Sequence, residues 1–169
     1  KTEIKLNDEK AIGAYAKGGI TGVTTTVNAD GKLTFTKESA VGLYVENGAK
    51  IVEGSTSNLD FSGANSKKNI GMYLAGSNWE GNSAVTFDSD HSKGNVYIYA
   101  QGSRNGGTDT GSTLTPKALF TVSPTGTASA TDRTIGIYLN TEVKGNPGSY
   151  VSNTVDMSNP SGKLVVDKE

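Results

Sequence analysis

The sequence predicts an all-β protein built as a parallel β-helix, or β-solenoid, of about five coils of 26–46 residues with two loop insertions. Three observations predict it. A tyrosine motif recurs at intervals of one coil, short apolar runs alternate with period 2, and turn-forming residues separate the runs. The chain has 169 residues, with 22 Gly, 20 Thr, 17 Ser and 14 Asn. These types are poor in helix interiors and favour turns, so a helical bundle is excluded.

The repeated motif has the form apolar-Gly-apolar-Tyr-apolar. Its copies are Ile12-Gly13-Ala14-Tyr15-Ala16, Val41-Gly42-Leu43-Tyr44-Val45, Ile70-Gly71-Met72-Tyr73-Leu74, Ile135-Gly136-Ile137-Tyr138-Leu139 and, with Tyr in place of Gly, Val96-Tyr97-Ile98-Tyr99-Ala100. Their first positions are 29, 29, 26 and 39 residues apart. A propeller blade needs about 40–45 residues per repeat, and the leucine-rich signature is missing, so the β-helix is favoured.

A second pattern, apolar-x-apolar, lies between the copies of the first. It reads Ile4-Lys5-Leu6, Leu33-Thr34-Phe35, Leu59-Asp60-Phe61, Val85-Thr86-Phe87, Ala118-Leu119-Phe120 and Leu164-Val165-Val166. The segment 31–38 closely matches 162–169. We therefore expect residues 1–169 to be one β-helix segment, excised from a longer array.

Strand alternation predicts which side chains face the core. Ile12, Ala14 and Ala16 are expected to face inward, and Gly13 and Tyr15 outward. Tyr97, at a Gly position, is then expected to face outward as well. Stacked coils should form internal ladders of Phe35, Phe61, Phe87 and Phe120, and of Ile12, Val41, Ile70, Val96 and Ile135.

Charge and composition exclude several classes of function. The net charge is −1 and the pI is about 5.9, so no footprint for nucleic acid is present. Cysteine is absent and His91 is the only histidine, which excludes disulfides, thiol catalysis and a His-rich metal centre. We expect no cofactor and no metal. The short acidic run Asp88-Ser89-Asp90-His91 and the stretch Asn105-Gly106-Gly107-Thr108-Asp109 are too incomplete to predict a cation site.

Catalytic patterns are missing too. There is no nucleophile elbow and no phosphate-binding loop, and the carboxylates lie mainly in turns, such as Asp30 and Glu46. We expect a protein that is not an enzyme.

The candidate binding residues are Trp79, Arg133, Tyr150, Tyr97 and Tyr99. The outward tyrosines form either a stabilising stack or an aromatic face for a glycan or protein. Trp79 is either an exposed contact residue or a packing residue. Two breaks in the period, at 121–134 and 140–161, predict loop insertions, and such loops either bind partners or are neutral excursions. Val155-Asp156-Met157 is a candidate short strand in the second.

The Ile-Gly-x-Tyr segments, followed by Asn-Gly turns and Leu-x-Phe strands, resemble the passenger repeats of large autotransporters (type V secretion), most closely the giant fusobacterial outer-membrane adhesins. The resemblance covers the chain through residues 12–15, 41–44, 70–73 and 135–138. Tyr97 and the two insertions depart from it. No binding residue of the family can be transferred, because the repeats are scaffold.

The resemblance implies a right-handed β-helical passenger at the cell surface, extracellular and tethered to the outer membrane by a C-terminal barrel absent from this chain. The implied partner is a host-cell or bacterial surface protein or glycan. We expect a monomer that does not insert into a membrane. The missing cysteines suit a chain that crosses such a barrel unfolded.

Two other functions remain open at this point. One is a polysaccharide-degrading or glycan-binding β-helix, which would require a groove with convergent carboxylates if it were catalytic. The other is a phage tail-fibre segment, for which we would expect a trimer in solution.

Overall fold

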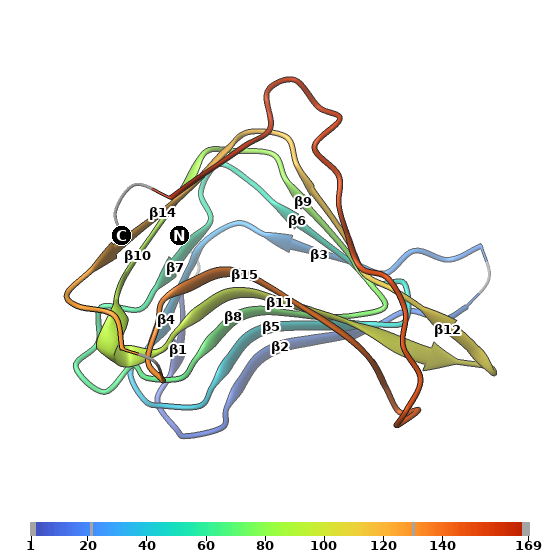
Figure 1. Cartoon of the computed structure of the whole chain (residues 1–169), viewed down its shortest axis with the longest axis horizontal. Coiled ribbons are helices and arrows are strands. Elements are labelled where there is room, and N and C mark those ends of the chain that lie inside the picture. Colours follow the sequence, from blue (N-terminus) through green and yellow to red (C-terminus); the bar gives the residue numbers. More distant parts are fainter. Residues whose placement is uncertain (1–2, 21, 130, 167–169) are drawn as a thin grey trace.

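The chain folds into short β-strands joined by turns. The computed structural model describes residues 3–20, 22–129 and 131–166. Within these ranges the only helical segment is one 3₁₀ turn, η1 (His91–Lys93). Figure 1 shows the chain passing through three faces in turn, with strands of successive repeats lying side by side on each face. The protein is therefore all-β with parallel sheets, as predicted, and the arrangement is compatible with a β-solenoid.

The face that carries the tyrosine motif is called the Tyr sheet. Its parallel strands are, in spatial order, β2 (Ile12–Lys17), β5 (Val41–Glu46), β8 (Ile70–Ala75), β11 (Val96–Asn105) and β15 (Ile135–Lys144). β12 (Thr108–Thr110) pairs antiparallel with the end of β11. Gly106 and Gly107 connect the two strands and have φ values of 55° and 86°. Positive φ at both central residues is typical of a two-residue hairpin turn, and glycine adopts it readily.

The apolar-x-apolar segments form two three-stranded parallel sheets, called the Phe sheets. The first contains β1 (Glu3–Leu6), β4 (Lys32–Phe35) and β7 (Asn58–Asp60), and the second contains β10 (Val85–Asp90), β14 (Leu119–Thr125) and β17 (Lys163–Val166). Leu33 and Phe35 are buried and Thr34 is half-buried, so the predicted alternation of this strand is confirmed.

The third face is a parallel sheet that the sequence patterns largely missed. This Trp sheet contains β3 (Thr26–Ala29), β6 (Lys50–Glu53), β9 (Asn78–Gly81), β13 (Thr113–Pro116) and β16 (Thr154–Val155). Only β16 overlaps a strand predicted from the sequence, the candidate short strand at 155–157. The second positions of the strands in this sheet form an apolar row of Val27, Ile51, Trp79, Leu114 and Val155. The sequence patterns missed this row because its residue type changes from strand to strand and no fixed motif surrounds it.

The tyrosine register is confirmed in all five motif strands. Tyr15, Tyr44, Tyr73, Tyr99 and Tyr138 are consecutive partners across the Tyr sheet. The residues that precede and follow these tyrosines are mostly buried, with Leu43, Val45, Met72, Leu74, Ile98 and Ala100 at most 6% exposed. The prediction of which motif residues face the core is therefore confirmed for the third, fourth and fifth positions of the motif.

The predicted orientation of the motif glycine is wrong. A Cβ on Gly42 would lie 2.9 Å from the Phe35 ring and 3.1 Å from Leu33 Cδ2, so this position faces the core. Tyr97, at the same position in β11, is accordingly buried at 2% exposure instead of facing outward. Since the glycine position and the next one both face inward, the alternation breaks there. As a consequence the row of Ile12, Val41, Ile70, Val96 and Ile135 is in register but only half-buried, with Ile12 50% exposed.

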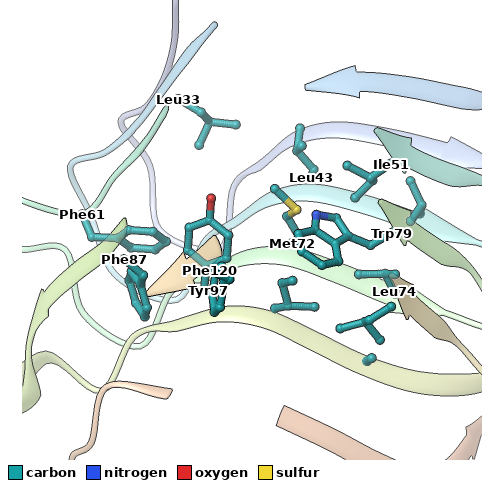
Figure 2. Packing of buried hydrophobic residues seen from close by; sticks show 14 of the residues in the cluster. Leu33, Leu43, Ile51, Phe61, Met72, Leu74, Trp79, Phe87, Tyr97 and Phe120 are labelled. Atoms are coloured by element: carbon teal, nitrogen blue, oxygen red, sulfur yellow. The ribbon is translucent and has the colours of Figure 1, made fainter. Parts of the chain in front are cut away.

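The internal phenylalanine ladder is correct for three of its four members. Phe35 stacks on Phe61 at 4.4 Å between ring centroids, and Phe61 contacts Phe87 at 5.1 Å. Phe87 is then paired with Val122 instead of Phe120. The ring of Tyr97 lies between them, 5.2 Å from Phe87 and 5.1 Å from Phe120. Figure 2 shows Phe61, Phe87, Tyr97 and Phe120 together with Trp79 and Met72, and all of them belong to one core cluster.

Both predicted insertions contain more strand than expected. Residues 121–125 belong to β14, so of the first insertion only 126–129 and 131–134 are described as loop. Residues 140–144 continue β15, and the backbone of Glu142 forms an antiparallel bridge with that of Tyr150. In Figure 1 the first loop lies beside η1 at one corner, whereas the second segment bends outward near β12 and again at the top of the view. The two insertions therefore do not form one common surface.

Candidate binding surface

The outward row of tyrosines is the most regular feature of the exterior. Neighbouring rings lie 5.1, 4.7, 5.0 and 5.2 Å apart between centroids, from Tyr15 through Tyr44, Tyr73 and Tyr99 to Tyr138. Tyr15 and Tyr138 at the two ends are 53% and 44% exposed, and the three in between are half-buried. The rings stabilise one another, and each remains partly accessible to solvent.

A carboxylate organises one border of this row. Glu46 Oε1 accepts a hydrogen bond from Tyr15 Oη at 2.7 Å, and Oε2 accepts one from Tyr44 Oη at 2.8 Å. Lys17 Nζ is 3.4 Å from Oε1, and Lys144 forms an ion pair with Oε2. Lys144 also lies over the Tyr44 ring, 4.7 Å from its centroid. The cluster ties β15 to a strand nearly a hundred residues earlier in the chain.

The hydrogen bonds to Glu46 set its protonation. Burial by itself would raise the pKa of Glu46, but the bonds from Lys144, Tyr15 and Tyr44 outweigh it and lower the pKa to about 2. Burial and the neighbouring Glu46 carboxylate raise the pKa of Tyr44. Near neutral pH Glu46 is therefore a carboxylate that accepts hydrogen bonds from the neutral phenols of Tyr15 and Tyr44.

Farther along the row, amides take the place of the carboxylate. Asn140 Nδ2 donates to Tyr99 Oη at 2.8 Å, and Gln101 Nε2 donates to Tyr73 Oη. The hydroxyls of Tyr15, Tyr44, Tyr73 and Tyr99 are thus held by side chains two residues further along the same or an adjacent strand. We call the five tyrosines with Glu46, Gln101 and Asn140 the tyrosine face.

The hairpin β11–β12 projects beside one end of the tyrosine face (Figure 1). Arg104 Nε is 3.7 Å from Asp109 Oδ1 across the hairpin, and Asn146 Nδ2 donates to Asp109 Oδ2 at 3.0 Å. This last bond places the turn around residue 146 against the hairpin. Tyr150, which follows that turn, is 71% exposed.

Two of the candidate binding residues lie together, but in the core. Trp79 is 1% exposed, and its Nε1 donates to Glu53 Oε2 at 3.1 Å. Tyr97 Oη donates to the other oxygen of Glu53 at 2.5 Å, and Ser57 Oγ donates to that same oxygen at 2.8 Å. Two roles were considered for Trp79, and its buried position in β9 is that of a packing residue. Neither Trp79 nor Tyr97 lies on the surface.

Glu53 itself was missed by the sequence analysis. It is fully buried, and burial raises its pKa while the bonds from Tyr97, Ser57 and Trp79 oppose that change. The alternation Lys50-Ile51-Val52-Glu53 contained the signal, because Glu53 shares the inward parity of Ile51. A buried carboxylate needs donors, and Trp79 and Tyr97 provide two of them.

The other three candidates are at the surface, at separate places. Tyr99 is half-buried in the tyrosine face, and Tyr150 is exposed near the hairpin. Arg133 is exposed in the loop beside η1, where its Nε donates to the Ser129 carbonyl at 2.9 Å. Tyr99 and Tyr150 both pair with β15, at Tyr138 and Glu142, whereas Arg133 lies in the separate loop beside η1.

The carboxylates outside the core do not converge. Glu80 pairs with Lys50 and, at 2.8 Å, with Lys117, and Asp60 pairs with Lys32 at 2.9 Å. Asp90 accepts from the Ser92 backbone N–H at 2.8 Å and so caps η1. In the described part of the chain, no three His, Cys, Asp or Glu side chains are grouped so as to hold a metal ion.

Nothing in the described ranges forms a helix with the length and hydropathy required to cross a bilayer. Comparisons of the chain with protein-family models, with curated proteins and with solved structures found no match.

Proposed function

We propose that the chain is a segment of a right-handed parallel β-helix of about five coils, and that it acts as a binding rod in a surface-displayed adhesin of the autotransporter passenger type. The pairing of each motif strand with the equivalent strand of the next repeat supports the solenoid. The right hand is supported by the strong preference of parallel strand crossovers for that hand.

The observation that carries the binding role is the tyrosine face. Its rings and hydroxyls are held by stacking and by hydrogen bonds, so little side-chain entropy remains to be lost when a partner binds. Tyr138 and Tyr150 add exposed aromatic surface of the kind enriched in protein interfaces. The partner we propose is a protein or glycan on a host cell or another bacterium.

In this proposal the mechanism is presentation, without chemistry. The sheets keep the tyrosine face and the hairpin rigid, and the partner is recognised by shape, stacking and hydrogen bonding. The ion pairs of Glu80 and Asp60 favour this over the polysaccharide-degrading alternative, because Glu80 is already paired with Lys50 and Lys117, and Asp60 with Lys32.

The test measures binding of the labelled chain to host epithelial cells, to bacterial cells and to an array of immobilised glycans. Tyr150→Ser with Arg104→Ser, and separately Tyr138→Ser, should each weaken binding at least tenfold. Lys5→Ser, on a Phe sheet, is the matched exposed control and should leave binding unchanged.

The proposal is wrong if the native chain binds no surface. It is also wrong if the Tyr150→Ser/Arg104→Ser variant and the Tyr138→Ser variant both bind as the native chain does. Release of new reducing ends from a polysaccharide would support the catalytic alternative instead.

A further inference from the structure

The sequence contains two Asn-Gly dipeptides, and the fold places them in different surroundings. Asn47-Gly48 follows β5 at the corner between the Tyr sheet and the Trp sheet, and Asn105-Gly106 begins the turn of the β11–β12 hairpin (Figure 1). An asparagine side chain before glycine is prone to attack by the glycine's own backbone nitrogen, because glycine has no side chain to hinder the approach. The two sites have nearly the same local chemistry, so a difference in their reactivity has to come from the fold.

Asn47-Gly48 is held by three hydrogen bonds. The backbone N–H of Asn47 donates to Ala75 O at 2.9 Å, and that of Gly48 donates to Gly76 O at 2.7 Å. The side-chain Oδ1 of Asn47 accepts a hydrogen bond from Ser103 Oγ at 2.7 Å. The nitrogen that would attack and the amide that would be attacked are therefore both fixed, and at least one of these bonds has to break before the reaction.

Asn105-Gly106 lacks these restraints. Both residues are exposed, and within the described part of the chain neither the Gly106 N–H nor the Asn105 side chain forms a hydrogen bond. The backbone pair of Asn105 with Thr108 is the outermost of the three pairs of the hairpin, so it can open without disturbing the others. Arg104 Nη2 donates to Gly107 O at 3.0 Å, which places a guanidinium group beside the turn. A guanidinium group near a backbone amide favours loss of the amide proton.

The reaction that this arrangement allows needs only water. The Gly106 nitrogen gives up its proton to base in solution and forms a bond to Asn105 Cγ. The bond from Cγ to Nδ2 then breaks, and Nδ2 takes up a proton and leaves as ammonia. Water opens the resulting succinimide ring at either of its carbonyls, which leaves aspartate or isoaspartate at position 105. No electrons are transferred, and attack within one chain is favoured by proximity.

We propose that Asn105 is a site of spontaneous deamidation and that the fold protects Asn47 from the same reaction. Each event replaces a neutral amide with a carboxylate next to Arg104, whose Nε lies 3.7 Å from Asp109 Oδ1. Isoaspartate also adds one carbon to the main chain beside a turn of two glycines, so it should disturb the pairing of position 105 with Thr108. The modification does not depend on the proposed binding role of the tyrosine face.

The test incubates the folded chain at mildly alkaline pH, digests it with a lysine-specific protease and follows two peptides by mass spectrometry. Peptide 94–117 contains Asn105, and peptide 38–50 contains Asn47. Peptide 94–117 should gain the mass difference between water and ammonia about tenfold faster than peptide 38–50, because hydrogen bonds have to break first at Asn47. Fragmentation of peptide 94–117 should place the gain at position 105. In urea the two rates should become similar.

Asn105→Gln is the matched variant, because glutamine keeps the amide but would have to close a larger and less favourable ring. Peptide 94–117 of this variant should stay unmodified, while peptide 38–50 reacts as in the native chain. Far-UV circular dichroism verifies that the variant is folded. The inference is overturned if peptide 94–117 of the folded native chain stays unmodified, or if both peptides react at the same rate. A rate at Asn47 that does not rise in urea also overturns it, because the fold would then not be what protects this site.

Discussion

The outer and inner aromatic rows of this molecule follow different rules. The outer row, from Tyr15 to Tyr138, has one tyrosine per motif strand in unbroken register. The inner row runs Phe35, Phe61, Phe87, Tyr97, Phe120, and it takes members from two faces. Outside, each ring is partly exposed, and the strand pairing sets its place in the row while stacking and hydrogen bonds orient it. Inside, every ring must also fit the volume left by the others.

Tyr97 is the point at which the two rows diverge. In β5 and β8 the motif glycine leaves room for a leucine and a phenylalanine of the opposing Phe sheet. In β11 the ring of Tyr97 occupies that room. β14 then pairs with β10 two residues out of the expected alignment, with Val122 opposite Phe87. A shift of two keeps the same side chains inward, so the core stays apolar while its volume is redistributed.

The largest loss of stability is expected from Tyr97→Gly, which restores the glycine of the motif but removes one ring from the inner row. The variant removes a buried ring and leaves Glu53 without one of its donors, so the free energy of unfolding should fall by about 3–5 kcal/mol. Urea denaturation followed by circular dichroism measures it. Tyr97→Phe keeps the ring and should lose only about 1–3 kcal/mol. Equal stability of the glycine variant and the native chain would contradict the space-filling role.

Glu46→Gln tests whether the outer row depends on its border of charge. The pKa of Glu46 is lowered from 4.5 to about 2 in the folded chain, so the carboxylate stabilises the fold fully above pH 4.5. That contribution, about 3 kcal/mol at most, should disappear as the pH falls from 4.5 toward 2. Denaturation of the native chain and the variant at several pH values should show their difference shrinking over this window.

Glu142→Gln is the matched control for this measurement, because Glu142 is exposed and forms none of the ion pairs of the described residues. Its difference from the native chain should stay near zero at every pH. A Glu46 difference that does not vary with pH would show that the carboxylate acts through packing alone.

The smallest effect is expected from Tyr138→Ala, at the open end of the outer row. Tyr138 is 44% exposed and stacks only on Tyr99, so its loss should cost about 0.5–1.5 kcal/mol. Urea denaturation beside Tyr97→Gly compares the two rows directly. If the two substitutions lower the free energy of unfolding equally, the outer row, set by strand pairing, and the inner row, set by packing volume, do not differ in the way described.

Much of the outer surface could be predicted from residue spacing. The motif repeats once per coil, and parallel pairing needs only that equivalent residues recur at equivalent places. The Trp sheet could not be predicted in this way. Its inward row of Val27, Ile51, Trp79, Leu114 and Val155 changes residue type from strand to strand, so no repeated motif marks it in the sequence. Trp79 lies in this row between Ile51 and Leu114, and all three are buried, but only the strand pairing reveals the row.

The sequence by itself determined that the chain is all-β, where the tyrosine strands lie, and that their tyrosines face outward in one row. These properties depend on local periodicity and turn chemistry, which a single chain displays along its length. Only the tertiary structure decided the inner row, the burial of Tyr97 and Trp79 around Glu53, and the separation of the two insertions. Those depend on how volume and hydrogen-bond donors from three faces are shared, and no single strand carries that information.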